Sequence, residues 1–135
     1  MVNYLFFKGC TIPANLPNIE KLTLEILPEI GINLSVSDEF TCCPDPIRLQ
    51  GANQYFWMVS AARNITIAEE KNMNIMTLCN GCENTLGIVN FKLKNNPKLK
   101  SKVNEVLKDI GREFKGTIEV KHFLQVLKED IGLDN

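Results

Sequence analysis

The sequence has little of what marks several large classes of protein. Its 15 basic and 16 acidic residues leave a formal net charge of −1, so the cationic excess of a nucleic-acid-binding surface is missing. No apolar run approaches the ~18 residues that a membrane-spanning helix requires, so we expect no membrane span. The opening residues MVNYLFFKGC lack the charged start and the cleavage site of a signal peptide, and a cytoplasmic protein is expected.

Histidine is scarce as well, with His122 the only one, whereas cysteine is well represented. The cysteines are Cys10, Cys42, Cys43, Cys79 and Cys82. Reducing compartments do not keep disulfides, and an odd number of thiols cannot pair completely. Cys42 and Cys43 are neighbours in FTCCPDP, and a disulfide between neighbours lies outside normal disulfide geometry. Metal binding or redox chemistry therefore explains these thiols better.

Hydrophobic periodicity predicts strands that alternate with helices. Short apolar or β-branched runs predict four strands, at 2–7, at 32–36, at 74–79 and within 116–124. Helical spacing predicts helices at 18–27, 52–72, from after Cys82 to about Leu93, at 96–111 and at 123–132. This alternation implies parallel βαβ units. Because the length suits one core and no linker is visible, we expect a single α/β domain over residues 1–135, with a parallel sheet of about four strands flanked by helices.

The predicted layout places every cysteine just after a strand. Cys10 follows the first strand, Cys42 and Cys43 follow the second, and Cys79 and Cys82 lie at the end of the third. In an open α/β sheet, the loops beyond the carboxyl ends of the strands gather at one edge. We therefore expect all five thiols to converge on one site there, with none of them in a helix interior.

The donor set favours an iron–sulfur cluster but leaves zinc open as an alternative. CNGC (79–82) is a C-x-x-C in which Gly81 is expected to allow a tight turn, a motif that serves both zinc and thiol–disulfide chemistry. Four thiolates complete a zinc tetrahedron and leave one over, whereas a polynuclear cluster uses more. Sulfur donors without a nearby histidine favour iron–sulfur. A thioredoxin-like enzyme is disfavoured because CNGC lacks the aromatic-Cys-Gly-Pro-Cys surroundings.

The cysteine pattern resembles a known family, the cysteine-rich CCG domain. Cys10, the pair Cys42–Cys43 and Cys79-x-x-Cys82 are spaced as in the first of the two such domains of the heterodisulfide reductase B subunit. The resemblance extends over essentially the whole chain. Further segments that carry it are GCTIPANLPNIE, CCPDP, AARNITIAEE, TLCNGC and the closing EDIGL.

The resemblance implies a Rossmann-like cysteine-rich domain whose cofactor is a noncubane 4Fe–4S cluster, two smaller clusters that share an iron and a sulfide. It implies that all five cysteines are the cluster ligands, Cys10, Cys42, Cys43, Cys79 and Cys82. The implied reaction is the two-electron reduction of the mixed disulfide of coenzyme M and coenzyme B, known from methanogenesis. The implied partners are the other heterodisulfide reductase subunits, the iron–sulfur C subunit and the flavin A subunit.

The sequence departs from that family by supplying one cysteine-rich domain where the family has two. It therefore provides the ligands for one half of the expected active site, as part of a disulfide reductase. The second interpretation is a zinc-binding or cluster-binding domain that docks partners without redox catalysis of its own. Outside the cysteines, His122 is best explained as a structural histidine, and residues 55–58 as a core helix with an exposed aromatic edge.

Overall fold

The first strand, β1 (Val2–Phe7), is apolar on both faces because both faces are buried. Leu5 and Phe7 pack into one hydrophobic cluster, while Tyr4 and Phe6 pack into a second cluster on the opposite face. Side chains alternate along a strand, so a continuous apolar run is what a strand covered on both sides requires. β1 is accordingly an inner strand, and the cores of the domain lie on either side of it.

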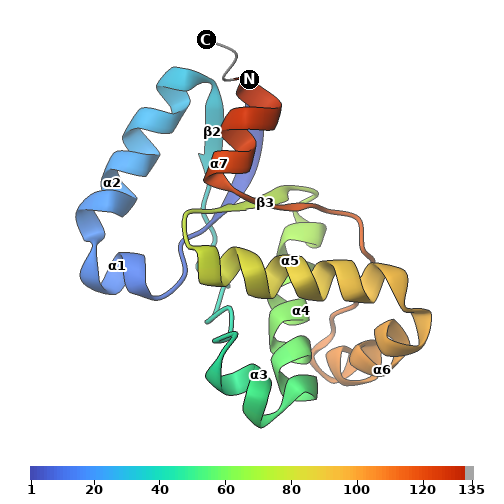
Figure 1. Cartoon of the computed structure of the whole chain (residues 1–135). Coiled ribbons are helices and arrows are strands. Elements are labelled where there is room, and N and C mark those ends of the chain that lie inside the picture. The colour runs from blue at the N-terminus through green and yellow to red at the C-terminus, as the bar shows by residue number, and fades with distance from the viewer. Residues whose placement is uncertain (133–135) are drawn as a thin grey trace.

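A computed structural model describes residues 1–132 of the chain (Figure 1). Its four strands form one sheet in the order β2–β1–β3–β4, and each neighbouring pair is parallel. The other strands are β2 (Ile32–Ser35), β3 (Asn74–Thr77) and β4 (Val120–His122). The expected α/β class and parallel sheet of about four strands are confirmed.

Helices cover both faces of this sheet. The larger cluster joins one face to the three long helices α4 (Gln54–Glu70), α5 (Asn80–Asn95) and α6 (Pro97–Leu107). The smaller cluster joins the other face to α2 (Pro17–Ile26), the 3-10 turn η1 (Leu27–Ile30), α7 (Phe123–Val126) and the π-helical turn η3 (Leu127–Ile131). Three short elements complete the fold, α1 (Thr11–Asn15), α3 (Arg48–Ala52) and η2 (Lys108–Ile110).

Several boundaries differ from the expected ones, and at two of them side-chain hydrogen bonds interrupt the regular pattern. The helix expected at 52–72 begins only at Gln54, since Asn53 is extended and its side chain accepts a hydrogen bond from the Phe56 N–H. The fourth strand is confined to residues 120–122. Upstream of it, the Glu69 carboxylate accepts hydrogen bonds from the N–H groups of residues 115–117, and these groups do not join the sheet.

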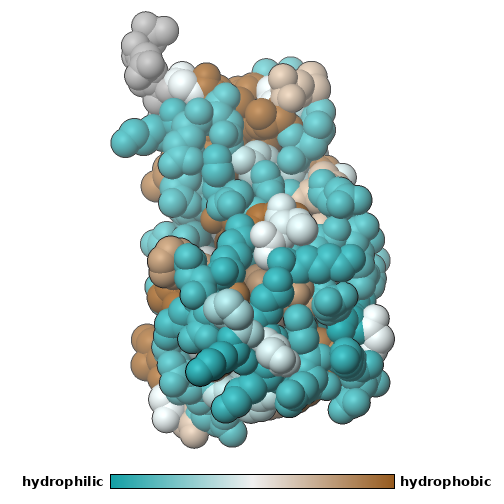
Figure 2. All heavy atoms as spheres, turned by 90° about the vertical axis from the view of Figure 1, so that its right-hand side faces the viewer, coloured by the Kyte–Doolittle hydropathy of each residue, from teal (hydrophilic) through white to brown (hydrophobic). Residues whose placement is uncertain are grey.

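The outer face of α6 is polar. Lys98, Lys102 and Lys108 are exposed, and Figure 2 shows a largely hydrophilic surface on the side where α6 lies. None of the helices within residues 1–132 is both long enough and apolar enough to cross a bilayer. The last residue of the EDIGL segment, Leu133, lies outside the described residues.

Candidate metal centre

The loop after β1 brings Cys10 to the carboxyl edge of the sheet. Gly9 has a φ of 74°, a left-handed conformation that glycine adopts without strain, and Cys10 then stands at the start of α1. A Cβ atom at position 9 would lie 2.9 Å from the sulfur of Cys82. Gly9 therefore has two roles, because it turns the chain and leaves room for a second cysteine.

The loop after β2 carries Cys42 and Cys43 to the same edge. Cys43 is buried at 6% exposure, while Cys42 is exposed. Pro44 follows directly and disfavours a helical backbone conformation at Cys43. Asp45 then accepts hydrogen bonds from the N–H groups of Ile47 and Arg48, at 2.8 and 2.6 Å, which turns the chain into α3.

The CNGC segment lies at the junction of β3 and α5. The helix starts at Asn80, before the start expected after Cys82, so Cys79 is its N-cap and Cys82 lies in its first turn. The expected tight turn at Gly81 is therefore the helix start itself, and Gly81 needs no positive φ. First-turn N–H groups have no partner within the helix, and the positive end of the helix dipole favours thiolates there.

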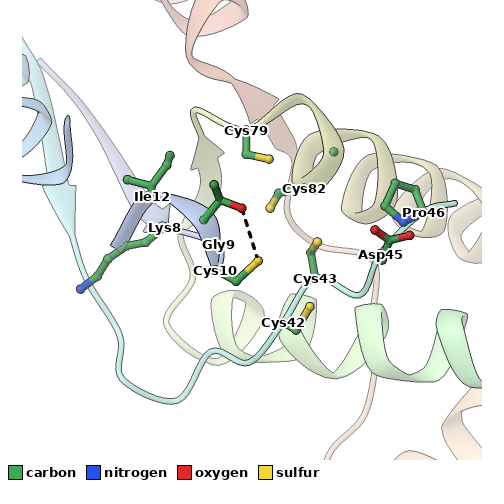
Figure 3. Close-up of a pocket in the computed structure, with 12 residues that line it drawn as sticks. Lys8, Gly9, Cys10, Ile12, Cys42, Cys43, Asp45, Pro46, Cys79 and Cys82 are labelled. Atoms are coloured by element: carbon green, nitrogen blue, oxygen red, sulfur yellow. Dashed lines mark hydrogen bonds between the residues drawn. The ribbon is translucent and has the colours of Figure 1, made fainter. Parts of the chain in front are cut away.

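These three loops form one site, so the expected convergence of the cysteines is confirmed. All five line a single cavity of about 150 Å³. Figure 3 shows their side chains around one space, arriving from three separate segments of the chain. Cys43 and Cys82 form its buried wall, whereas Cys10 and Cys42 are exposed and Cys79 is intermediate. The site is therefore sulfur-rich, with one protected side and one side open to solvent.

The buried pair Cys43 and Cys82 concentrates negative charge at one sulfur. A hydrogen bond from the Cys82 thiol lowers the pKa of Cys43 to about 7, and the same hydrogen bond together with burial raises the pKa of Cys82. Burial, followed by the nearby Cys43 charge, raises the pKa of Cys42. In the metal-free site a thiolate therefore forms more readily at Cys43 than at Cys42 or Cys82. Binding a cation releases the remaining protons.

The cavity suits a group of several atoms better than a single ion. Within residues 1–132, no three thiol, imidazole or carboxylate groups are placed to hold one metal ion. A volume of about 150 Å³ is many times the roughly 10–15 Å³ needed for one water molecule. The five cysteines offer soft thiolate ligands, which iron–sulfur clusters prefer and which zinc also accepts. The residues present therefore fit a polynuclear cluster.

His122 and residues 55–58, which the sequence analysis considered, lie outside this cavity, and so does Arg63. His122 caps α7, where its Nδ1 accepts from the Leu124 N–H, and its Nε2 lies 3.0 Å from the Leu78 carbonyl oxygen. Arg63 donates to the Glu39 carbonyl oxygen at 2.6 Å. Trp57 is buried and Phe56 is exposed, as expected for a core helix with an aromatic edge. The structural interpretation of His122 is confirmed.

We predict that Gly9→Ala destabilises the protein more than Gly111→Ala. The φ of Gly111 is also positive, at 70°, but a Cβ atom there would meet nothing within 4 Å. The left-handed backbone alone costs an alanine about 1–2 kcal/mol. Contact with the Cys82 sulfur adds about 1–3 kcal/mol of overpacking at position 9. Denaturant unfolding of the reduced, metal-free variants measures both losses, and equal losses would show that the contact has no effect.

Comparison with known proteins agrees with this geometry. A family model described as CCG, a cysteine-rich domain, matches residues 4–87, which is more than half of the chain. The chain belongs to the CCG family of cysteine-rich domains. The matched segment contains all five cysteines of the cavity.

Within this family, the chain is similar to the B subunits of heterodisulfide reductases. It is 36% identical over 132 residues to the B subunit of the ferredoxin/F420H2-dependent CoB-CoM heterodisulfide reductase of Methanosarcina acetivorans, covering 98% of this chain and 44% of that protein. It is 37% identical over 134 residues to a heterodisulfide reductase B-subunit-like protein of Archaeoglobus profundus, covering 99% and 45%. The chain thus spans less than half the length of these curated relatives.

Two more distant similarities concern one further relative in sequence and one in fold. The membrane anchor subunit of the 8-methylmenaquinol:fumarate reductase of Wolinella succinogenes is 27% identical over 128 residues, covering 95% of this chain and 44% of that protein. A solved structure of a hypothetical protein from Helicobacter pylori superposes with a TM-score of 0.80 at 16% identity, covering 94% of this chain and 25% of that one. The latter similarity supports the fold alone.

Sequence reasoning missed two polar residues that hold the cysteine loops. Asn64 of α4 and Thr85 of α5 are buried, and both make hydrogen bonds to the loop that carries Cys42 and Cys43. A signal was present in the sequence, because both residues are polar but lie at helical spacing from the buried positions of long helices. Such residues need a hydrogen-bond partner when buried, but the sequence does not say which.

Proposed function

We propose that the chain is an iron–sulfur redox module of a heterodisulfide reductase, with a noncubane 4Fe–4S cluster bound by all five cysteines. The observation that carries the proposal is the single cavity lined by thiols from three separate loops of the sheet. The similarity to the B subunits of heterodisulfide reductases supports the same function. Adjacent thiols such as Cys42 and Cys43 suit neighbouring irons of one cluster, because two neighbouring residues are hard to place around one ion.

The cysteines of the site differ in their proposed roles because some are buried and others are exposed. Cys43 and Cys82 hold the cluster from the buried side, and Cys79 and Cys82 reach it from the N-terminal end of α5. Cys10 and Cys42 lie on the exposed side, where a substrate sulfur would approach. When bound, the cluster supplies one-electron chemistry and iron sites that accept a sulfur ligand.

The substrate and the partners follow from the same proposal. We infer that the disulfide reduced is the mixed disulfide of coenzyme M and coenzyme B, in a cytoplasmic complex. The partners are a second CCG domain, the iron–sulfur C subunit and the flavin A subunit. Support comes from the name of the Methanosarcina acetivorans relative, which is the B subunit of a CoB-CoM heterodisulfide reductase. The Wolinella succinogenes relative is a fumarate reductase subunit, so the proposed substrate follows the heterodisulfide reductase relatives alone.

Metal analysis of the anaerobically prepared chain tests the proposal. We expect about four iron and four sulfide per chain after reconstitution, a brown colour, and no stoichiometric zinc. Electron paramagnetic resonance of the oxidised and reduced protein then reports the cluster type. A colourless protein with one zinc per chain and no iron would favour the alternative, a structural or docking domain.

A further inference from the structure

The loop that carries the cysteine pair is held in place by side chains. Among the described residues, no backbone–backbone hydrogen bond reaches residues 41–44, although the loop lies between β2 and α3. An unsupported loop of this kind opens readily in solution. Its fixed position therefore depends on the groups that helices α4 and α5 present to it.

Asn64 is the first of these groups. It lies in α4 with no exposed surface, and its amide contacts the loop at two successive residues. Its Oδ1 accepts from the Thr41 N–H at 3.0 Å, and its Nδ2 donates to the Cys42 carbonyl oxygen at 2.9 Å. One side chain thus holds the peptide group that precedes Thr41 and the peptide group that joins Cys42 to Cys43.

Thr85 is the second group and acts from the other helix. Its Oγ1 donates to the Pro44 carbonyl oxygen at 3.0 Å, and the side chain is fully buried. Asn64 holds the peptide that precedes Cys43, and Thr85 holds the peptide that follows Pro44. Together these two residues, which we name the Asn64–Thr85 clamp, hold the loop on both sides of Cys43.

The need for a clamp follows from the adjacency of the two cysteines. Adjacent side chains of an extended strand point to opposite faces, so Cys42 and Cys43 face one cavity only if the backbone between them is held away from the regular extended form. The residue after them is Pro44, which has no N–H and so cannot donate a backbone hydrogen bond. External partners must therefore hold the geometry.

We infer that the Asn64–Thr85 clamp consists of positioning residues that orient Cys42 and Cys43 toward the bound cluster. This inference rests on the proposed function for the identity of the bound group, but not for the positioning of the thiols. Neither residue lines the cavity, so neither touches the cluster. Their effect is exerted through the loop backbone.

The test compares Asn64→Leu with Asn90→Leu in the whole chain. Asn90 is a matched control because it is also a buried helical asparagine whose Nδ2 donates to a backbone carbonyl at 3.0 Å, that of Ile118, outside the cysteine loops. The first readout is alkylation of the reduced, metal-free protein by iodoacetamide, followed residue by residue with mass spectrometry. We expect Asn64→Leu to speed the modification of Cys43 about tenfold relative to Cys10, because the loop opens more often. Asn90→Leu leaves this ratio unchanged.

The second readout is the reconstituted protein itself. Asn64→Leu is expected to lower the iron content and to alter the electron paramagnetic resonance spectrum of the remaining cluster, whereas Asn90→Leu retains the spectrum of the unaltered chain. Equal effects of the two variants, or no effect of Asn64→Leu in either readout, would overturn the inference. If the unaltered chain binds no iron, the proposed function fails, and the alkylation ratios alone then decide whether the clamp positions the thiols.

A second pair of variants covers the case in which Asn64→Leu does not fold. Thr85→Val removes only the hydroxyl that donates to Pro44, with little change of shape. Its control is Thr66→Val, because Thr66 is also buried but donates to a carbonyl of its own helix, that of Arg63, at 2.7 Å. We expect faster alkylation of Cys43 in Thr85→Val alone, and the same rate in both variants would contradict the clamp.

Discussion

Replacing either Cys42 or Cys43 with serine is expected to remove most of the iron that the chain binds after anaerobic reconstitution. Serine keeps the shape of the side chain but replaces a soft thiolate with a hard, weakly acidic hydroxyl. The larger loss is expected for Cys43→Ser, because Cys43 is buried in the cavity wall and forms a thiolate more readily than Cys42. The hydrogen bond from Cys82 lowers the pKa of Cys43 to about 7, whereas burial raises the pKa of Cys42. Iron and sulfide analysis of each variant measures the effect.

The same experiment distinguishes a cluster held by five cysteines from a zinc site held by four. Zinc needs four thiolates, so a zinc site would tolerate the loss of one cysteine among the five. Thr11→Ala is the control, because Thr11 lines the cavity but has no thiol that could bind iron. Its hydroxyl lies 3.8 Å from the Cys10 sulfur. Full iron occupancy in either cysteine variant would exclude the five-ligand cluster, whereas reduced occupancy in Thr11→Ala as well would point to a general weakening of the cavity.

Convergence of the cysteines was predictable because it depends on topology. Once β1, β2 and β3 are recognised as parallel strands, their carboxyl ends must meet at one edge, and each cysteine follows one of these strands closely. The prediction did not need the exact strand ends. This explains why the site was found from sequence although several element boundaries were not.

One boundary that was wrong depends on contacts between distant residues. The sequence of residues 115–117 gives no sign that these N–H groups bind the Glu69 carboxylate, nearly fifty positions away, and so stay out of the fourth strand. The start of α5 at Asn80 was missed because glycine and asparagine near a helix start have low intrinsic helix propensity. In the structure this start places Cys79 and Cys82 at the positive end of the helix.

The roles of Asn64 and Thr85 were hidden for the same reason. A buried polar side chain within a helix indicates that a hydrogen-bond partner exists. Only the packing of α4 and α5 against the loop identifies the partners, which are the carbonyl of Cys42 for Asn64 and that of Pro44 for Thr85. The cysteines that line the cavity were thus readable from sequence, while the buried polar groups that hold their loop were not. The distinction is physical, because ligands are defined by their own chemistry and positioning residues by their neighbours.

The chain alone is expected to reduce the mixed disulfide of coenzyme M and coenzyme B at least about 100-fold more slowly than the same chain supplemented with a second CCG domain. It spans 44–45% of the heterodisulfide reductase relatives and contains cysteines for one cavity of this kind. Cleavage of a disulfide needs two electrons, and one cluster passes one at a time. The exposed Cys10 and Cys42 also leave the proposed approach side open, so the substrate lacks positioning and shielding from water.

The assay follows anaerobic oxidation of a reduced viologen by the mixed disulfide. It is run with the chain alone, with a polypeptide bearing the second domain alone, and with both together. A mixture that contains Cys43→Ser in place of the unaltered chain is the control, and it should be as slow as the second domain alone. Sedimentation of the isolated chain accompanies the assay, because two copies facing each other would supply two clusters. Turnover by a monomeric chain equal to that of the mixture would show that one cluster suffices, and the half-site proposal would then be wrong.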